Sequence, residues 1–417
     1  MFFARRGESS LSMMHGALAL VLALLAPWAS SVEPKLQAAL SAPTLRNAYI
    51  GALVIQADDG SPVFERHADR AFQPASTFKL IVGSTAFARL DPTVRLETKL
   101  FARGPIQNGT LFGDLYLRGG GDATLSPADL HDAAMAVRAA GISRIDGNIV
   151  ADASRYTAAP YPQGWSVDDL PFDYADPVSA LSLRDDATNS DAATWHPARS
   201  ALIAFARSLA HAGVVIHGRL FSHGITPAGV RLVWLHQSAP LPAIIADCWI
   251  PSDNLIAELL LEELGVGTAP PETTRGGGIE RERAWLTSIG VDVKTVTIAD
   301  GSGLSQYDRI TPRDLVTILD ADWHSDERAQ IMEALPVAGN SGTLKHQMTT
   351  PPLAGNVIAK TGTMMHTRAL AGYIRTQRHG TLIFSLLVNN WMNEDTPGAI
   401  EELHAAQARF LQALIEG

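Results

Sequence analysis

The chain has 417 residues, of which 46% are hydrophobic and 18% are charged, and its formal net charge is −10 at pH 7. This composition is typical of a globular protein, and the length favours two domains or one domain with an insertion. The acidic balance argues against a nucleic-acid-binding protein, which would need clustered Lys and Arg to contact phosphates. The single cysteine, Cys248, excludes an intrachain disulfide framework and a multi-thiolate metal site.

The N-terminal residues have the pattern of an export signal. Arg5 and Arg6 precede an uncharged stretch over 16–28 that is rich in Leu, Ala and Val, and small residues follow. We therefore predict a secretory signal peptide over 1–31. The alternative is a retained N-terminal anchor, for which the apolar run is short. The mature protein is expected to be soluble and secreted or periplasmic, with at most a loose peripheral contact with a membrane.

The mature chain begins with a predicted hairpin. Apolar and β-branched residues over 48–56, a turn, and an extended pattern over 62–65 indicate two paired strands. Pro74 then precedes a strongly apolar segment over 76–90. This segment predicts a helix that is buried on nearly every side.

Residues 93–232 have a different texture, with short extended pieces between loops rich in Gly, Pro, Asp and Trp. One amphipathic helix, 127–140, ends at Gly141, a residue type suited to close a helix. We interpret this region as an inserted domain of β-structure and irregular loops. The extended pieces are 98–101, 114–117 and 148–151.

Helices return after residue 241. Leucines over 255–264 alternate with Glu258, Glu262 and Glu263, which predicts a helix with one apolar and one polar face. The hairpin near the N-terminus and the strands near the C-terminus indicate one mixed sheet built from both ends of the chain. Further helices are predicted over 276–289, 312–319 and 396–415, and strands over 356–363, 368–377 and 381–390.

Ser76-Thr77-Phe78-Lys79 places a hydroxyl and an amine on one face of the first helix. A serine hydroxyl becomes a nucleophile when a neighbouring base takes its proton. Burial among apolar residues lowers the pKa of a lysine, so that Lys79 can be that base. Backbone N–H groups at the helix start would stabilise an oxyanion. The alternative is a helix-capping Ser76 and a solvated Lys79.

Two further motifs follow, and each has a structural alternative. Ser252-Asp253-Asn254 stands ahead of a helix, where these residue types are also the preferred N-caps. Lys360-Thr361-Gly362-Thr363 lies on a predicted strand, where its lysine and hydroxyls could hold a carboxylate and its glycine would allow close approach. The alternative for this strand is an edge position whose lysine discourages aggregation. Two of only six lysines fall in the first and third motifs.

The order Ser-x-x-Lys, Ser-Asp-Asn, Lys-Thr-Gly marks penicillin-binding proteins and class A β-lactamases. With these motifs the chain resembles the D-alanyl-D-alanine carboxypeptidase/endopeptidases among the class C low-molecular-mass penicillin-binding proteins. The likeness covers residues 45–390. Four further segments are similar to signatures of that family: 118–125, 168–183, 300–313 and 336–344.

The resemblance implies an α+β fold, in which a transpeptidase/β-lactamase-like domain has an antiparallel sheet flanked by helices. A large β-rich insertion lies between the first and second motifs. We accordingly predict a catalytic domain over 32–92 and 233–417 and an inserted domain over 93–232. By resemblance, Ser76 is the acylated nucleophile and Lys79 its base. Ser252 relays a proton to the leaving amine, and Asn254 holds Lys79 and the substrate amide. The substrate-binding residues are Lys360, Thr361, Gly362 and Thr363.

These expectations define a serine D-Ala-D-Ala carboxypeptidase/endopeptidase that acts on peptidoglycan peptides through an acyl-enzyme and is inhibited covalently by β-lactams. A β-lactamase-type hydrolase is one alternative, although no segment offers an obvious glutamate-bearing loop for deacylation. A non-catalytic penicillin-binding or scaffold protein is the other. No cofactor and no metal are expected, because the thirteen histidines are scattered and form no His-Glu-x-x-His or Cys/His cluster.

Overall fold

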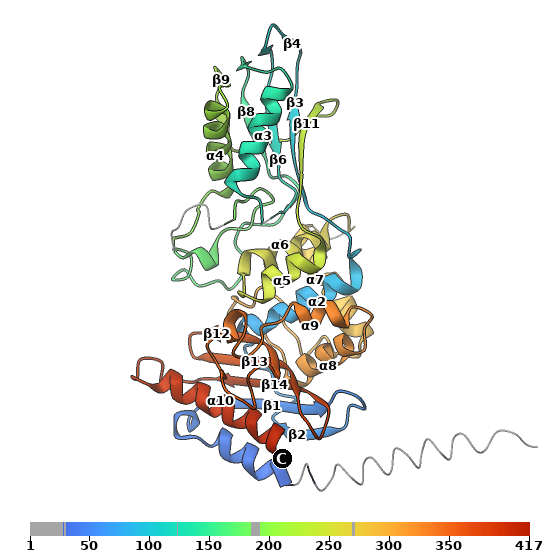
Figure 1. Cartoon of the computed structure of the whole chain (residues 1–417), viewed down its shortest axis with the longest axis vertical. Helices are drawn as coiled ribbons and strands as arrows, with labels where there is room; N and C mark the ends of the chain where they lie inside the picture. The colour runs from blue at the N-terminus through green and yellow to red at the C-terminus, as the bar shows by residue number, and fades with distance from the viewer. Residues whose placement is uncertain (1–27, 29–30, 123, 185–191, 269–271) are drawn as a thin grey trace, which may run out of the picture. The chain divides into compact units, whose positions relative to one another are not determined.

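The computed structural model describes residues 28, 31–122, 124–184, 192–268 and 272–417 (Figure 1). The chain divides into two compact units, one formed by residues up to 72, 310–324 and 336–417, and the other by 73–309 and 325–335. The predicted signal peptide lies outside the described residues, apart from Trp28 and Ser31. Within the described part of the chain, no helix combines the length and apolarity needed to cross a membrane.

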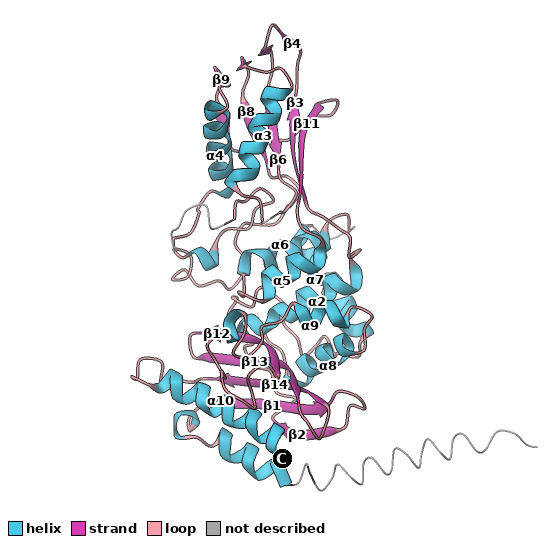
Figure 2. Ribbon diagram, in the orientation of Figure 1, coloured by secondary structure: helices cyan, strands magenta, loops and turns pink. Residues whose placement is uncertain are grey.

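The first unit contains a five-stranded antiparallel sheet in the order β12-β13-β14-β1-β2 (Figure 2). Its strands come from both ends of the chain, as predicted, but none of them is parallel, so the expectation of a mixed sheet is wrong. The N-terminal hairpin joins the three C-terminal strands through an antiparallel pairing of β1 with β14. The strands are β1 (Tyr49–Gln56), β2 (Pro62–Arg66), β12 (Val357–Met364), β13 (Thr367–Arg375) and β14 (Thr381–Asn389).

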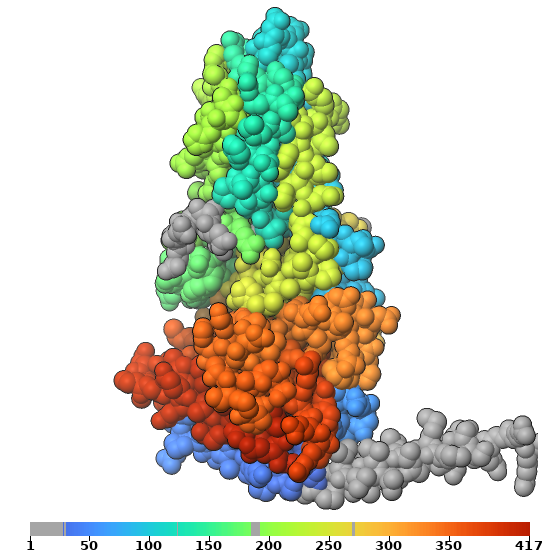
Figure 3. All heavy atoms as spheres, in the orientation of Figure 1, coloured from blue at the N-terminus to red at the C-terminus, as the bar shows by residue number. Residues whose placement is uncertain are grey.

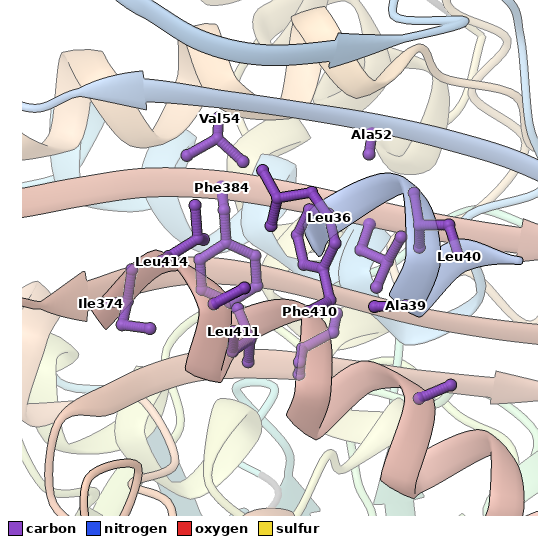
Figure 4. Close-up of a cluster of buried hydrophobic side chains, with 14 of the residues drawn as sticks. Leu36, Ala39, Leu40, Ala52, Val54, Ile374, Phe384, Phe410, Leu411 and Leu414 are labelled. Atoms are coloured by element: carbon purple, nitrogen blue, oxygen red, sulfur yellow. The ribbon is translucent and has the colours of Figure 1, made fainter. Parts of the chain in front are cut away.

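Helices cover both faces of this sheet. Successive strand residues point to opposite faces, and Val54 lies in the core that α10 (Ala399–Glu416) forms with the helical residues 31–40 (Figure 4). Gly51 points the other way, where an added Cβ would meet Pro312 of α8 (Pro312–Trp323). The α+β fold with an antiparallel sheet flanked by helices is therefore confirmed.

The second unit carries a helical layer and two smaller sheets. The helix predicted over 76–90 is a 3-10 turn, η2 (Ala75–Phe78), that continues into α2 (Lys79–Arg89). Trp249, the last residue of α5 (Leu241–Trp249), donates its Nε1–H to the Lys79 carbonyl oxygen at 2.9 Å and so connects α5 to α2. The other helices of this layer are α6 (Asn254–Gly265), α7 (Thr274–Ser288) and α9 (Arg328–Glu333).

Helix α6 corrects the prediction of one polar face. Glu258 and Glu262 are both buried, with 0% and 1% of their surface exposed. Glu262 pairs with Arg275 of α7 at 3.0 Å, and Glu258 accepts hydrogen bonds from the loop that follows residue 300. Partners from distant segments thus cover a face that the sequence pattern alone assigns to solvent.

The larger of the two sheets in the region between the first and second motifs has five strands in the order β10-β8-β6-β3-β11. Helices α3 (Pro127–Ala139) and α4 (Pro197–His211) share a buried core with it. The side chains of α3 and β11 meet on the surface (Figure 3). Helix α3 was predicted from the sequence, whereas α4 was not. The strands are β3 (Glu97–Ala102), β6 (Leu115–Arg118), β8 (Ile149–Asp152), β10 (Leu220–Phe221) and β11 (Arg231–Gln237).

Four two-residue strands form the third sheet, in the order β4-β5-β7-β9. Both sheets between the motifs lie within residues 93–237, which the sequence analysis assigned mostly to an inserted domain. The proposed boundaries of that domain, at 93 and 232, stay a prediction. The short strands are β4 (Ile106–Gln107), β5 (Thr110–Leu111), β7 (Arg144–Ile145) and β9 (Val215–Ile216).

Candidate active site

Ser76 lies in the 3-10 turn η2, immediately before α2. The turn is anchored by Thr77, whose Oγ1 donates to the Pro74 carbonyl oxygen at 2.7 Å, and by the buried side chain of Phe78. No side chain caps η2 or α2, so Ser76 is not an N-cap residue. The capping alternative is therefore excluded, and the hydroxyl remains available for chemistry.

Lys79 has no exposed surface, which excludes the alternative of a solvated first-turn lysine. Its Nζ lies 2.9 Å from Ser76 Oγ, 2.5 Å from Asn254 Oδ1 and 2.8 Å from the Ser302 carbonyl oxygen. A neutral amine has two N–H groups and one lone pair. If the two N–H groups donate to Asn254 and Ser302, the lone pair is directed at the Ser76 hydroxyl, which is the arrangement that a general base requires.

The electrostatic surroundings of Lys79 favour this neutral form. Burial lowers the pKa of the amine below its usual value of 10.5, because the charged form loses its hydration. Cys248 and the carboxyl groups of Asp300, Asp253 and Glu258 act in the opposite direction without cancelling the effect of burial. Lys79 is therefore a stronger candidate for a base at neutral pH than an exposed lysine.

Asn254 is the first residue of α6, and hydrogen bonds at both its amide nitrogen and its amide oxygen fix the orientation of its side chain. Its Nδ2 donates to the Tyr174 carbonyl oxygen at 2.7 Å, next to η3 (Asp173–Ala175), and this leaves Oδ1 to accept from Lys79. Asp253 is the N-cap, because its side chain accepts from the Ile256 N–H at 2.8 Å. Ser252 precedes the cap in a left-handed conformation with φ of 71°, a strained state that is common at functional sites.

The loop over 300–305 delivers the Ser302 carbonyl oxygen to Lys79. Asp300 holds this loop, since its carboxylate accepts from the Gly303 and Ser305 N–H groups, both at 2.7 Å. Gly303 has φ of +76°, and a Cβ there would lie 2.1 Å from the Ala75 carbonyl oxygen. The loop thus packs directly on the turn that carries Ser76, and this packing requires a glycine.

Glu258 supports the same loop from α6. Its Oε1 accepts from the N–H groups of Gly301 at 3.0 Å and Ser302 at 2.9 Å. Burial, together with the neighbouring Asp300 carboxylate, raises the pKa of Glu258 from 4.5 to about 8. Glu258 is therefore mainly protonated at neutral pH, so it opposes the neutral form of Lys79 less than a fully charged carboxylate would.

The third motif lies in the first unit, on the edge strand β12. Lys360 has no exposed surface, and its Nζ donates to the Thr361 carbonyl oxygen at 3.0 Å. Thr361 Oγ1 donates to Thr343 Oγ1 at 2.7 Å, in the short turn η5 (Gly342–Leu344). The edge position fits the structural alternative, but a buried lysine cannot act as the exposed charge that deters aggregation.

The structure thus brings together Ser76, Lys79 and Asn254 of the predicted residues. It adds the carbonyl oxygens of Ser302 and Tyr174, which no side-chain motif could indicate because the main chain supplies them. The segments that contain them were recognised only as family signatures. Among the described residues, no group of three or more His, Cys, Asp or Glu side chains is arranged to hold a metal ion. The assembled groups can activate a serine hydroxyl for acyl transfer.

Comparisons with known proteins find matches to this chain in both sequence and fold. The family model described as D-Ala-D-Ala carboxypeptidase 3 (S13) matches residues 32–194 and 182–410. A D-alanyl-D-alanine carboxypeptidase of Actinomadura sp. (strain R39) is 28% identical over 91% of this chain and 84% of the relative. The crystal structure of penicillin binding protein 4 from Haemophilus influenzae has a TM-score of 0.80 at 21% identity, covering 93% of this chain and 98% of that one. A penicillin G-acylated endopeptidase of Bdellovibrio bacteriovorus has a TM-score of 0.60 at 19% identity, covering 88% and 93%.

Proposed function

The chain belongs to the D-Ala-D-Ala carboxypeptidase (S13) family, and on that premise we propose that Ser76 and Lys79 catalyse the hydrolysis of peptidoglycan peptides that end in D-Ala-D-Ala. The family resemblance drawn from the sequence is confirmed. The observation that carries the proposal is the buried Lys79 amine, which has two oxygen acceptors for its protons and lies 2.9 Å from the Ser76 hydroxyl.

The reaction proceeds in two steps. Lys79 takes the Ser76 proton, and Ser76 Oγ attacks the carbonyl carbon between the two D-Ala residues. The C–N bond then breaks, an ester to Ser76 forms, and the terminal D-Ala leaves as an amine that receives a proton through Ser252. Water next attacks the ester, releases the shortened peptide and restores the Ser76 hydroxyl. A β-lactam follows the first step only, and it stays attached as a covalent adduct.

The remaining motif residues receive binding roles. Asn254 orients Lys79, supported by the Tyr174 carbonyl oxygen, and contacts the substrate amide. In the family pattern, the Lys-Thr-Gly strand binds the terminal carboxylate, so we assign this role to Lys360, Thr361 and Thr363, with Gly362 allowing the substrate backbone to approach. We also propose that the protein acts outside the cytoplasm after removal of residues 1–31, because its substrate is the cell wall.

Labelling with a fluorescent penicillin tests the nucleophile. Wild-type protein should gain one covalent adduct, and Ser76→Ala should lose it while its circular dichroism spectrum is unchanged. Ser41→Ala, which changes an exposed serine outside the site, should label like wild type. An adduct that persists in Ser76→Ala, or that maps to another residue by mass spectrometry, would refute the assignment.

Measurements of peptide hydrolysis and of penicillin turnover distinguish the carboxypeptidase from the two alternative functions. Release of free D-Ala from a short peptide ending in D-Ala-D-Ala is expected for the carboxypeptidase. Rapid turnover of penicillin without a lasting adduct would instead favour a β-lactamase-type hydrolase. A stable penicillin adduct without any hydrolysis of peptides or of purified peptidoglycan would favour a non-catalytic penicillin-binding protein.

A further inference from the structure

A small polar pocket of about 130 Å³ lies in the second unit, where the neighbouring strands β3 and β6 begin and end, respectively. Four of its lining side chains are basic, in a chain whose formal net charge is −10. One lining side chain is acidic, and Leu96 and two glycines after β6 complete the wall. The basic residues are Arg95, Lys99, Arg118 and Arg155, and the acidic residue is Glu97.

Only part of this positive charge is neutralised by the protein. Lys99 Nζ lies 2.5 Å from Glu97, and Arg155 makes two contacts with Glu263, at 2.9 and 2.5 Å. The side chain of Arg118 is exposed and makes no ion pair or hydrogen bond with any residue that the structure describes. Four basic groups therefore share two carboxylates, and the pocket keeps a positive excess.

Two of these basic groups also act on the carboxyl group of Glu97. Hydrogen bonds from Lys99 and Gln237 lower the pKa of its carboxyl group, and the positive charges of Lys99 and Arg155 lower it further. The remaining basic group, Arg95, donates to the Ser238 carbonyl oxygen at 2.6 Å and so brings no second carboxylate to the pocket.

The backbone forces two like charges together at this place. Lys99 of β3 stands directly opposite Arg118 of β6 in the antiparallel ladder, and like charges in such pairs are destabilising. The chain after β6 then passes very close to its neighbours, because a Cβ at Gly120 would lie 2.0 Å from the Glu97 carbonyl oxygen. An anion in the pocket would offset the repulsion that this geometry creates.

The pocket is connected to the proposed active site through α6. Arg155 is held by Glu263, near the end of that helix, and Asn254 at its start contacts Lys79. Residues 254 and 263 are nine positions apart, which corresponds to about 14 Å along a helix. An extended peptide of roughly four residues spans the same length, so a polymeric substrate can reach both places.

We propose that this basic pocket binds a carboxylate of peptidoglycan other than the carboxylate of the D-Ala-D-Ala end. The inference rests on the proposed function, because that function supplies the polymer. The planar guanidinium of Arg118 can donate two parallel N–H bonds to a carboxylate, and Lys99 adds a further charge. The pocket would hold the polymer while a peptide end enters the site at Ser76.

Sedimentation of the full-length protein with purified peptidoglycan tests binding, in a Ser76→Ala background that prevents turnover. Arg118→Gln should weaken retention roughly 3- to 10-fold, as expected for loss of one partly exposed charge-assisted contact. Arg207→Gln removes the same charge from an exposed position on α4 and should bind like the parent. Equal retention by both variants would overturn the proposal.

Chemical changes in the polymer identify the group that binds. Peptidoglycan whose carboxyl groups have been converted to amides should be retained equally by the parent protein and by Arg118→Gln, because the treatment removes the group that Arg118 is proposed to contact. Retention that survives this treatment but disappears once phosphate-bearing polymers are removed with acid would assign the pocket to phosphate, and the proposal would be wrong.

Kinetics separates failure of this inference from failure of the function. The measured quantity is the KM for soluble peptidoglycan fragments divided by the KM for a short D-Ala-D-Ala peptide that carries no other carboxylate. In the active enzyme, which retains Ser76, Arg118→Gln should raise this ratio by about 3- to 10-fold, and Arg207→Gln should leave it unchanged. A constant ratio, with normal penicillin labelling, would refute the pocket alone. Absence of penicillin labelling in wild type would refute the function itself.

Discussion

Glu258 offers the sharpest test of how the fold supports the Lys79 base. Glu258→Leu keeps a similar volume but removes the acceptor of two buried N–H groups, those of Gly301 and Ser302. Each unsatisfied buried group costs about 1–3 kcal/mol, so the free energy of unfolding should fall by roughly 2–6 kcal/mol. Acylation should also slow, because the loop would no longer hold the Ser302 carbonyl oxygen against Lys79.

Glu258→Gln separates hydrogen bonding from ionisation. The amide keeps an oxygen acceptor in the same place but does not titrate. In wild type, the pKa of Glu258 is raised from 4.5 to about 8, so over that pH range the unfolded chain releases a proton that the folded chain retains. The associated stability is fully present below pH 4.5 and is lost as the pH rises through 8. The raised pKa corresponds to a loss of at most roughly 5 kcal/mol.

The assay is urea unfolding of both proteins at pH 5, 6, 7 and 8, with the slope m required to stay constant. The unfolding free energy of Glu258→Gln minus that of wild type should increase with pH. Glu280→Gln, an exposed change on α7, should show no such trend. A Glu258→Gln difference that is independent of pH would refute the argument that Glu258 is protonated in the folded state.

Three further changes probe the site and the core. Asn254→Asp places a carboxylate against the Lys79 amine and should raise the pKa of that amine. In a pH–rate profile with penicillin, the acid limb of the acylation rate should move to higher pH, and acylation at pH 7 should slow by about tenfold or more. Gly303→Ala forces a side chain onto a backbone with φ of +76°. Urea unfolding should show that the free energy of unfolding falls by about 1–3 kcal/mol, and the acylation rate should fall as well. Phe410→Ala empties a fully buried position in the core of the first unit and should cost about 3–5 kcal/mol in the same measurement, without shifting the pH–rate profile.

The local sequence pattern was sufficient to predict those helices and strands whose burial is evident from their own residues. The strands β12, β13 and β14 are largely buried and separated by short turns, and each was predicted within two residues of its observed bounds. Helix α4 was missed although its buried residues, at positions 201, 202, 205 and 209, recur at helical spacing, because the loop-rich sequence around it led us to interpret the whole region as β-structure and loops. Its helical state is stabilised by packing of Phe205 into the core that it shares with β8, which the sequence does not display.

Long-range contacts explain the errors at the site. Glu258 has the spacing of a solvent-facing residue, and only the loop around Ser302, 44 positions later in the chain, makes it a buried acceptor. Conversely, Lys79 gains its chemistry from Asn254 and Ser302, at separations of 175 and 223 residues. A motif names the groups that could react, but their protonation states depend on which distant segments bury them and accept their protons.

This dependence has a consequence for chains that carry the same three motifs. The lone pair of Lys79 is directed at Ser76 only while the Ser302 carbonyl oxygen occupies one of its two N–H groups, and that carbonyl is held by Asp300 and Glu258 rather than by a motif residue. If the loop were released, an N–H group would be free to point at Ser76, and the amine would become a donor to the hydroxyl instead of its base. The carboxyl groups behind the loop are therefore as necessary to the nucleophile as the lysine beside it.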